Sequence, residues 1–584
     1  MRGFFKSVFA TVTGIFIALF VVVLFFSVIL INGSKSKSYN LQDDSILSLH
    51  LSGILKDQVQ SNPVLEMLGL SDADEIALAD ILSSIKKAKD NDKIKGIYIF
   101  SEYLSASNAS LLEIRNELEN FKKSGKFIVA YADTYLQGCY FLSSVADKVI
   151  LNPIGNLDLH GIASSRTFYK GLFEKIGVEV QVFKVGTYKS AVEPYILDKM
   201  STANREQVSS YVNDIWGTVL NNISESRNIP ITELNTIADQ LPLLRDTKLV
   251  LEKGLVDTLM YETDVKQHLA ELVGKESVDD VDFVTVENMT SVSSAVKEKE
   301  DKIAVLYAEG SIMSGKAETE INDRFYVEQL RKIKNDENVK AVVFRVNSPG
   351  GSAYASEQIW RAVTELKAVK PVVVSMGDYA ASGGYYISCS ASKIIAQPST
   401  LTGSIGIFGM FPNVEGLTKK IGLTFDNVKT NKFSDFGDFT RPMRDDEKII
   451  LQEYINEGYD KFLTRCAEGR GIPKDSLAKI AEGRVWTGNQ ALKIGLVDAL
   501  GGIDKAVDEA AKLAGTDSYS LEEYPVRKGF WENLFSDYTE SIAVKMLKDY
   551  FGSDYELIKT AKEIKEMKEQ DFIQARLPFN FELK

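Results

Sequence analysis

Ser382 is the residue whose surroundings first suggest chemistry. It lies between two alanines and two glycines in the stretch DYAASGGYY, residues 378–386, and such small neighbours let a backbone pack closely against another group. A serine nucleophile needs a base that takes its proton. The chain has three histidines, and none is near this stretch or in a recognisable catalytic motif: His50, His160 and His268. If Ser382 is a nucleophile, a base of another type has to be found.

A glycine pair follows a second apolar stretch, in the segment NSPGGS, residues 347–352. Glycines after a strand let backbone N–H groups point at a ligand oxygen. An oxyanion hole needs such donors, and the N–H of the residue after the nucleophile is the usual second donor. We therefore expect Gly350, Gly351 and Gly383 to form an oxyanion hole beside Ser382. Gly-Gly turns are common, so this motif is only moderately specific.

The chain repeats itself with an offset of 245 residues. Residues 93–100 (KIKGIYIF) match residues 338–345 (NVKAVVFR), and Asp133, Gly138 and Pro153 match Asp378, Gly383 and Pro398. The register holds without a gap from about residue 95 to residue 190. Short apolar strands alternate with amphipathic helices in each copy, which predicts βαβ units and a mostly parallel sheet.

We therefore predict an α/β protein with two copies of one unit, at residues 45–290 and 300–540. A polar linker or linking helix, residues 286–302, joins them. The tail, residues 541–584, contains a charged, helix-prone segment and is predicted to be helical.

The two copies differ where chemistry is expected. Ser382 falls opposite Gln137, and the glycine pair falls opposite EYLSAS, residues 102–107. Lys189, in KVGTYKSAVEPY, falls opposite Ser434. One copy thus has a serine without a lysine and the other a lysine without a serine, which indicates one site shared between the copies.

A lysine serves as a general base only when it is neutral, and burial in an apolar pocket lowers its pKa. The neighbours Val185, Tyr188, Ala191 and Val192 are candidates for such a pocket. The alternative interpretations are that Lys189 is an ordinary surface lysine and that the small residues around Ser382 serve only for packing.

Composition excludes several other classes. The formal net charge is −13, whereas a nucleic-acid-binding protein usually has a basic face. Cys139, Cys389 and Cys466 form no CxxC pair, so we expect neither a zinc site nor a disulfide framework. The sequence has no HExxH motif and no Walker loop. We expect no metal and no other cofactor.

Residues 8–31 contain no charge, and as a helix these 24 residues would span about 36 Å, enough to cross a bilayer. The segment is long for a signal peptide, and no A-x-A cleavage pattern follows it. We predict that residues 1–40 form a cytoplasmic stub and an uncleaved transmembrane anchor. Arg2 and Lys6 precede the apolar run, which favours a cytoplasmic N-terminus. The rest of the chain is expected to be one water-soluble body.

The segments NSPGGS, GDYAASGGYYIS, LTGSIGIFG and TYKSAVEPY strongly resemble the signal peptide peptidase A family, in its long, two-repeat, membrane-anchored form. The resemblance covers essentially the whole chain. It implies a Ser/Lys dyad, with Ser382 as the nucleophile and Lys189 as the general base. It also implies that Ser404, in TGSIG, hydrogen-bonds the lysine.

The same resemblance implies a fold shared with the Clp protease subunit and with crotonases. It implies a homotetramer whose active sites face an inner cavity, and remnant signal peptides as substrates. In this family the catalytic body lies on the periplasmic side of the bacterial inner membrane. Two other functions stay open: a crotonase-like acyl-CoA enzyme, which would use the glycine loop on a thioester, and a catalytically inert membrane scaffold.

Overall fold

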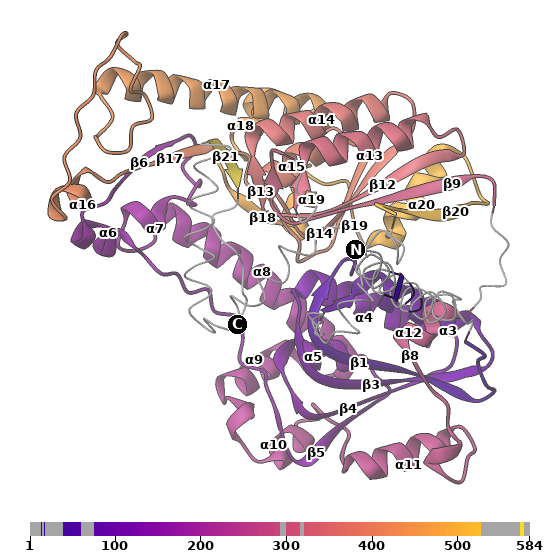
Figure 1. The fold of residues 1–584 in the computed structure, drawn as a ribbon. Coiled ribbons are helices and arrows are strands. Elements are labelled where there is room, and N and C mark those ends of the chain that lie inside the picture. Colours follow the sequence, from indigo (N-terminus) through magenta and orange to yellow (C-terminus); the bar gives the residue numbers. More distant parts are fainter. Residues whose placement is uncertain are drawn as a thin grey trace, which may run out of the picture.

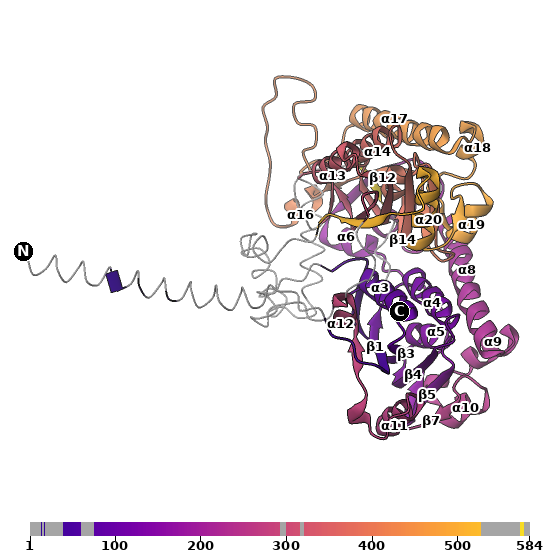
Figure 2. The ribbon, with the colours of Figure 1, turned by 90° about the vertical axis from the view of Figure 1, so that its right-hand side faces the viewer.

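The computed structural model describes residues 13–14, 17, 21, 39–59, 75–292, 299–315, 320–526 and 573–576. Figure 1 shows two α/β lobes, one above the other, with the N-terminal copy below and the C-terminal copy above. Figure 2 shows the same two lobes after a quarter turn. Each lobe has a sheet of its own.

The lower lobe contains a parallel sheet of seven strands in the order β2-β1-β3-β4-β5-β7, with β8 paired to β1. Its strands are β1 (Ser45–Lys56), β2 (Glu75–Ala77), β3 (Ile94–Ser105), β4 (Phe127–Tyr135), β5 (Lys148–Leu157), β7 (Thr258–Leu259) and β8 (Phe283–Thr285). The helices packed around it include α3 (Leu78–Asp90), α4 (Asn108–Lys122), α5 (Gln137–Ser143) and α11 (Glu262–Leu272).

The upper lobe repeats this order. Its path β20-β9-β12-β14-β15-β19 is parallel throughout and corresponds strand for strand to β8-β1-β3-β4-β5-β7. The strands are β9 (Lys302–Glu309), β12 (Val339–Ser348), β14 (Val372–Ala381), β15 (Lys393–Ala396), β19 (Ala499–Leu500) and β20 (Ser520–Tyr524). Two further strands extend the sheet from β14: β16 (Leu401–Gly403) and β18 (Val485–Thr487). The predicted α/β fold with mostly parallel sheets is confirmed.

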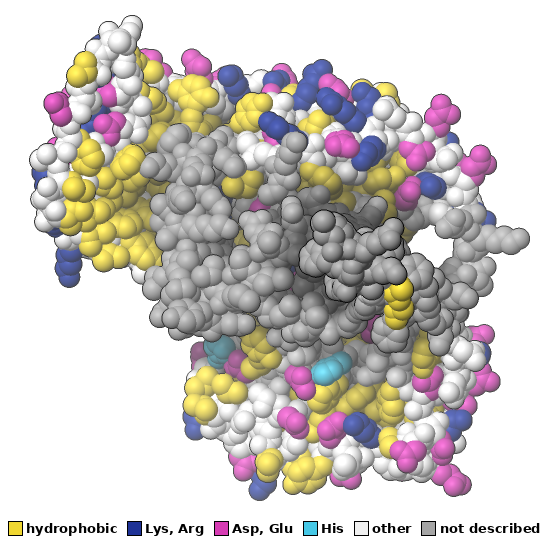
Figure 3. All heavy atoms as spheres, in the orientation of Figure 1, with side chains coloured by type: hydrophobic (Ala, Val, Ile, Leu, Met, Phe, Trp, Pro, Cys, Tyr) yellow, Lys and Arg dark blue, Asp and Glu magenta, His cyan; other side chains and the backbone are white. Residues whose placement is uncertain are grey.

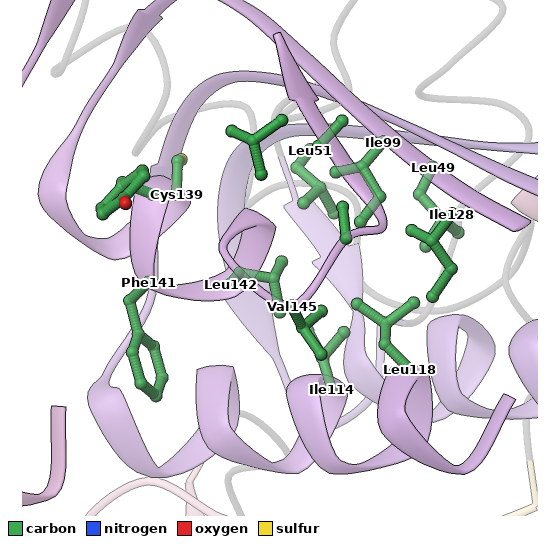
Figure 4. Close-up of a cluster of buried hydrophobic side chains, with 14 of the residues drawn as sticks. Leu49, Leu51, Ile99, Ile114, Leu118, Ile128, Cys139, Phe141, Leu142 and Val145 are labelled. Atoms are coloured by element: carbon green, nitrogen blue, oxygen red, sulfur yellow. The ribbon is translucent and has the colours of Figure 1, made fainter. Parts of the chain in front are cut away.

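The central strands are apolar on both faces because helices cover both sides of a parallel sheet. In β12, for example, Ala341 to Val346 are all buried. In the lower lobe, Leu49 and Ile99 face Ile114 and Leu118 of α4 across one buried cluster (Figure 4). Burial of each such side chain contributes about 1.5–3 kcal/mol to folding.

A third sheet joins the two copies. Its order is β11-β10-β13-β21-β17-β6, and β6 comes from the N-terminal copy. The strands are β6 (Glu179–Lys184), β10 (Ile312–Met313), β11 (Ile321–Asn322), β13 (Gly350–Ser352), β17 (Phe408–Asn413) and β21 (Ile573–Arg576). Figure 1 shows β6 with α6 (Lys170–Ile176) and α7 (Glu193–Ile196) beside β17 and α16 (Glu415–Lys420) of the upper lobe. The N-terminal copy therefore sends its residues 170–200 into the other lobe.

Two helices of 26 residues are equivalent between the copies, α8 (Thr202–Arg227) and α17 (Asp445–Arg470). Each helix ends in an arginine that hydrogen-bonds to a loop of its own copy. Arg227 bonds to Asp257 and the Gly254 carbonyl, as Arg470 bonds to Asp498 and the Gly495 carbonyl. α8 runs from the lower lobe to the upper lobe (Figure 1) and packs Val208, Tyr211 and Ile215 against Ala381, Leu401 and Val485.

The predicted anchor, residues 8–31, lies outside the described residues except at four positions. In the described part of the chain, no helix combines the length and the apolar character needed to cross a membrane. The predicted linker begins as a helix, α12 (Val286–Ser291), and residues 293–298 lie outside the described residues. Of the tail, residues 541–584, only β21 is described. β21 is a strand because its backbone pairs with β13 and β17, and the helix-prone segment of the tail, residues 555–570, lies outside the described residues.

Candidate active site

Ser382 stands at the turn between β14 and α15 (Gly383–Ser388), with φ 56° and ψ −112°. A positive φ is costly for a residue with a Cβ and persists only where the surroundings impose it. Two backbone bonds do so, from Ser382 N to Gly403 O at 2.8 Å and from Tyr386 N to Ser382 O at 2.8 Å. The turn is thus held by β16 on one side and by α15 on the other.

Lys189 reaches this turn from the N-terminal copy. Its Nζ lies 2.7 Å from Ser382 Oγ, 3.1 Å from Ser404 Oγ and 3.3 Å from the Ser404 carbonyl oxygen. The two residues are 193 positions apart in the chain. The contact forms because β6 pairs with β17, which carries the segment after β6 to the end of β14. The structure therefore brings together Ser382, Lys189 and Ser404.

The Lys189 side chain is fully buried, and burial lowers the pKa of its amine well below the ordinary value. The Phe408 ring centroid is 5.9 Å from Nζ, and Phe408 packs with Ala191 and Val192 in one apolar cluster. Two of the four predicted pocket residues are therefore in that cluster. Tyr188 instead turns towards Arg484, whose guanidinium lies 4.7 Å from the tyrosine ring centroid.

Close backbone contacts enclose the lysine stem. A Cβ on Gly483 would lie 2.7 Å from Lys189 Cβ, and one on Gly406 would lie 3.4 Å from Lys189 Cδ. Ser404 has φ 49° and donates its N–H to the Arg484 carbonyl at 2.7 Å. Glycines at 406 and 483 therefore let two loops of the C-terminal copy close over a lysine of the other copy.

The three predicted oxyanion-hole glycines also lie together. Gly350 has φ 97°, and a Cβ there would lie 2.7 Å from Gly383 N and would overlap the Ala575 carbonyl oxygen. A Cβ on Gly383 would lie 3.0 Å from the same carbonyl oxygen and 3.1 Å from Gly351 N. One carbonyl oxygen of the chain thus lies among the backbones of these glycines, where no side chain fits.

That carbonyl belongs to β21, which lies between β13 and β17 as an antiparallel strand. Gly350 is opposite Arg576 and Gly351 is opposite Ala575, while Gly409 of β17 is opposite Ile573. An extended peptide of the chain itself therefore occupies the groove between the glycine strand and β17. The groove holds this segment of the chain by backbone pairing on both sides, as in strand addition.

The equivalent place in the N-terminal copy is filled by a side chain. Gln137 Nε2 donates to the Gly161 carbonyl at 3.0 Å, and its Oε1 accepts the N–H groups of Gly161 at 2.9 Å and His160 at 3.0 Å. The Gln137 amide bridges its own loop and offers no nucleophile. Ser434, opposite Lys189 in the repeat, lies in an exposed loop.

The histidines are all engaged elsewhere in the N-terminal copy. His50 lies 3.1 Å from Glu102, His160 lies 2.6 Å from Asp158, and His268 lies 3.2 Å from Lys148. All three cysteines are buried and free. Within the described ranges, no group of three or more His, Cys, Asp or Glu side chains is arranged to hold a metal ion.

The sequence did not indicate two contributors to the site. Phe408 lies in the LTGSIGIFG segment, but nothing in that pattern shows that its ring covers a lysine from the other copy. Gln207 of α8 bonds to both neighbours of Lys189. At a constant offset of 245 residues, Gln207 falls opposite another glutamine, Gln452, so a comparison of the two copies does not single it out. The structural offset of the two helices is 243, as the starts of α8 and α17 show.

Known proteins are similar to this chain over most of its length. The family model described as peptidase family S49 matches residues 120–276 and 364–517, and the Clp protease model matches residues 294–401. Protease 4 of Haemophilus influenzae is 35% identical over 566 residues, which cover 93% of this chain and 90% of that protein.

Two further relatives are similar over most of their length. Protease 4 of Salmonella typhi is 39% identical and covers 84% of this chain and 82% of its own. The chloroplastic serine protease SPPA of Arabidopsis thaliana is 31% identical over 80% of this chain and 69% of that protein. With the two repeated sheets, these matches confirm an α/β fold with two ClpP-like domains.

Proposed function

The chain belongs to peptidase family S49, and from this premise we propose that it degrades signal peptides with a Ser/Lys dyad formed between its two copies. Ser382 is the nucleophile and Lys189 is the general base. The observation that carries these roles is the 2.7 Å contact between Lys189 Nζ and Ser382 Oγ inside a fully buried pocket. No histidine is within reach, and the lowered pKa of Lys189 suits an amine that has to be neutral at the start of the reaction.

The first half of the reaction forms an acyl-enzyme. The neutral Lys189 amine takes the hydroxyl proton of Ser382 while Oγ attacks the peptide carbonyl carbon. The negative charge on the carbonyl oxygen is stabilised by backbone N–H groups of Gly351 and Gly383. Gly350, the third predicted residue of the oxyanion hole, donates its N–H to Ser348 Oγ at 3.1 Å and instead leaves room for the carbonyl. The Lys189 ammonium then gives its proton to the amine of the leaving peptide, and the C–N bond breaks.

The second half releases the product. The neutral amine of Lys189 takes a proton from a water molecule, whose oxygen attacks the ester carbon. The ammonium returns the proton to Ser382 Oγ as the ester bond breaks. Ser404 keeps the amine aligned through both halves, since its Oγ lies 3.1 Å from Nζ. The balance of protons requires no metal and no nucleotide.

The substrate proposal rests on the groove that β21 occupies. The carbonyl oxygen of Ala575 lies beside Gly350 and Gly383, where the carbonyl of a scissile bond would have to lie. A small side chain precedes that bond in this arrangement, and the strand on either side is extended. Extended peptides with small and apolar residues, such as released signal peptides, match this groove. The name signal peptide peptidase among similar proteins supports the same substrate class.

We place the enzyme at the bacterial inner membrane, with residues 8–31 as the anchor and the body on the periplasmic side. The uncharged length of that segment supports the anchor. A homotetramer is the assembly that the family resemblance implies. Hydrophobic side chains gather on one flank of the molecule (Figure 3), which supports an interface between copies. The exposed hydrophobic residues on α6 and after α16 include Leu172, Leu423, Phe425 and Val428.

The test is a fluorogenic signal-peptide fragment incubated with the full chain in detergent. Wild type should cleave it, and Ser382→Ala and Lys189→Ala should each be inactive. Ser388→Ala and Lys199→Ala are matched controls, since the Ser388 hydroxyl donates to the Gly384 carbonyl within α15 and Lys199 is exposed. Full activity of Lys189→Ala would contradict the dyad, and hydrolysis of acyl-CoA without peptide cleavage would contradict the peptidase.

A further inference from the structure

Gln207 of α8 holds the backbone on both sides of Lys189. Its side chain is 1% exposed, and its Nε2 lies 3.0 Å from the Tyr188 carbonyl oxygen and 3.0 Å from Ser190 Oγ. Asn204 Oδ1, one turn earlier on the helix, lies 3.2 Å from the same nitrogen. The lysine loop is thus tied to α8 at the residue before and the residue after the amine-bearing side chain.

The other end of the same amide holds the C-terminal copy. Gln207 Oε1 accepts the N–H of Val485 at 3.1 Å. Val485 begins β18 and pairs with Gly403, and the preceding carbonyl, Arg484 O, accepts the N–H of Ser404 at 2.7 Å. One buried side chain therefore connects the loop that carries Lys189 with the strand that holds Ser404 and the turn of Ser382.

The other copy shows that this amide is not a general requirement of the fold. Arg227 and Arg470 make the same contacts at the ends of α8 and α17, so residues equally far before them are equivalent. Gln207 is twenty residues before Arg227, and the residue twenty before Arg470 is Ile450, which is 51% exposed. The copy without the lysine has no buried amide at this place.

We propose that Gln207 is a positioning residue of the dyad, which keeps the Lys189 amine in register with Ser382 and Ser404 and closes its pocket to water. This inference rests on the proposed Ser/Lys function. Without the amide, the Val485 N–H would be buried and unpaired and the Tyr188 carbonyl would lose its bond to α8, and such groups recruit water or force the segments apart. Either change lengthens the contact of 2.7 Å and hydrates the amine.

Hydration of the amine has a measurable consequence because burial is what lowers the pKa of Lys189. Charged groups lie around the lysine loop on several elements: Lys184 and Glu193 on its own segment, Glu206 on α8, and Glu482 and Arg484 before β18. Glu193 bonds to Ser201 and Asn204, and Arg484 lies 2.9 Å from Glu206. None of these charged groups is a cause of the lowered pKa of the Lys189 amine, which comes from burial. A more hydrated pocket therefore raises the pKa of Lys189. The amine is then protonated, and activity is lost, at a higher pH than in wild type.

The experiment compares wild type, Gln207→Met and Gln490→Met, as full chains in detergent, on a fluorogenic peptide between pH 5 and 10. Gln490 is the matched control, because it also bonds across the two copies, to Ser210 at 3.0 Å, but makes no contact with the lysine loop. For Gln207→Met we expect kcat to fall about 10–100-fold, as for a displaced catalytic group. We expect KM to change little, and the midpoint of the acid limb to move to higher pH.

Thermal unfolding of each variant separates positioning from stability. A lower Tm with an unchanged acid limb would make Gln207 a structural residue and overturn the proposal, as would a kcat within twofold of wild type. Gln207→Glu is the second variant, because it keeps an acceptor for Val485 N–H and adds a negative charge near the amine. Its acid limb should move further up than that of Gln207→Met, and an unmoved limb would contradict the inference.

The proposed function is tested separately in the same series by labelling Ser382 with a fluorophosphonate. If wild type shows neither Ser382-dependent labelling nor cleavage, the Ser/Lys function fails. If wild type shows both and Gln207→Met behaves like wild type, only the positioning role fails.

Discussion

At the residue scale, Lys189 owes its altered pKa to burial and not to a neighbouring charge. Its amine has two hydroxyls and one carbonyl within 3.3 Å and an aromatic ring over it, but no carboxylate. A carboxylate would favour the ammonium and defeat a general base. The pocket therefore favours the neutral form of the lysine, at the cost of burying an amine.

The pH dependence of activity follows from this. A base with a lowered pKa is neutral above that pKa, so kcat/KM should rise with pH through it and fall as the pH drops below it. Lys189→Arg should be inactive at every pH, because a guanidinium is not deprotonated in proteins. The measurement is kcat/KM from pH 5 to 10, and a flat wild-type profile across pH 6–9 would count against a lysine base that titrates there.

At the element scale, β13 and β21 explain why glycine stands at position 350. Gly350 has φ 97°, and a Cβ there would overlap the carbonyl oxygen of the strand in the groove. Both backbone strain and steric overlap therefore oppose any side chain. The second effect acts where the carbonyl of a substrate would bind.

Gly350→Ala should lose activity by about 100-fold or more, because its methyl group would stand where the substrate carbonyl binds and keep it from the oxyanion-hole donors. Gly422→Ala is the matched control, since Gly422 has φ 80° and open space around it. The control should lose about 1–2 kcal/mol of stability from the left-handed conformation and keep its activity. Kinetics and thermal unfolding of both variants check this. Equal activity losses would mean that strain alone matters.

Removal of β21 should free the groove for substrate. A chain that ends at residue 570 lacks the strand between β13 and β17. We expect the apparent KM for a peptide substrate to fall, because the same backbone groups no longer pair with Ile573–Arg576. Initial rates over a range of peptide concentrations test this, and an unchanged KM in a folded, truncated chain would show that β21 does not compete with substrate.

At the scale of the whole molecule, a site shared between two copies requires them to keep one relative position. Arg345 of β12 is buried between the lobes, where it lies 2.8 Å from Asp57 and 3.0 Å from Glu113 of the N-terminal copy. Asp378, half-buried nearby, accepts hydrogen bonds from Ser110, and desolvation raises its pKa to about 6. The interface beneath the active-site turn is therefore ionic as well as apolar.

Arg345→Met should be strongly destabilising, by about 3–5 kcal/mol, because it leaves two buried carboxylates without their cation. The matched control is Arg361→Met, which breaks the exposed pair with Glu365 at 2.9 Å and should cost about 0.5 kcal/mol or less. Urea unfolding at pH 8 measures both. A loss for Arg345→Met that is no larger than that of the control would contradict the account.

Much of the fold and the site follows from the sequence by itself. The repeat, the parallel sheets and the candidate site residues Ser382, Lys189 and Gly350 can be identified from residue types and from what each copy lacks. Local patterns carry that information because strands, helices and glycine turns depend on neighbouring residues. The complementary losses of serine and lysine also predict that the two side chains share one site.

Only the tertiary structure decided how they meet. The crossing of β6 to β17, the ring of Phe408 over the amine, the amide of Gln207 and the strand β21 in the groove all join segments far apart in the chain. No local pattern marks such pairs, because a buried polar side chain finds its partners only when separate elements pack. Gln207 also escaped the comparison of the two copies, because the long helices align at an offset of 243 residues and the preceding segments at 245. A shift of two residues leaves the helical pattern intact but changes which residue faces the lysine.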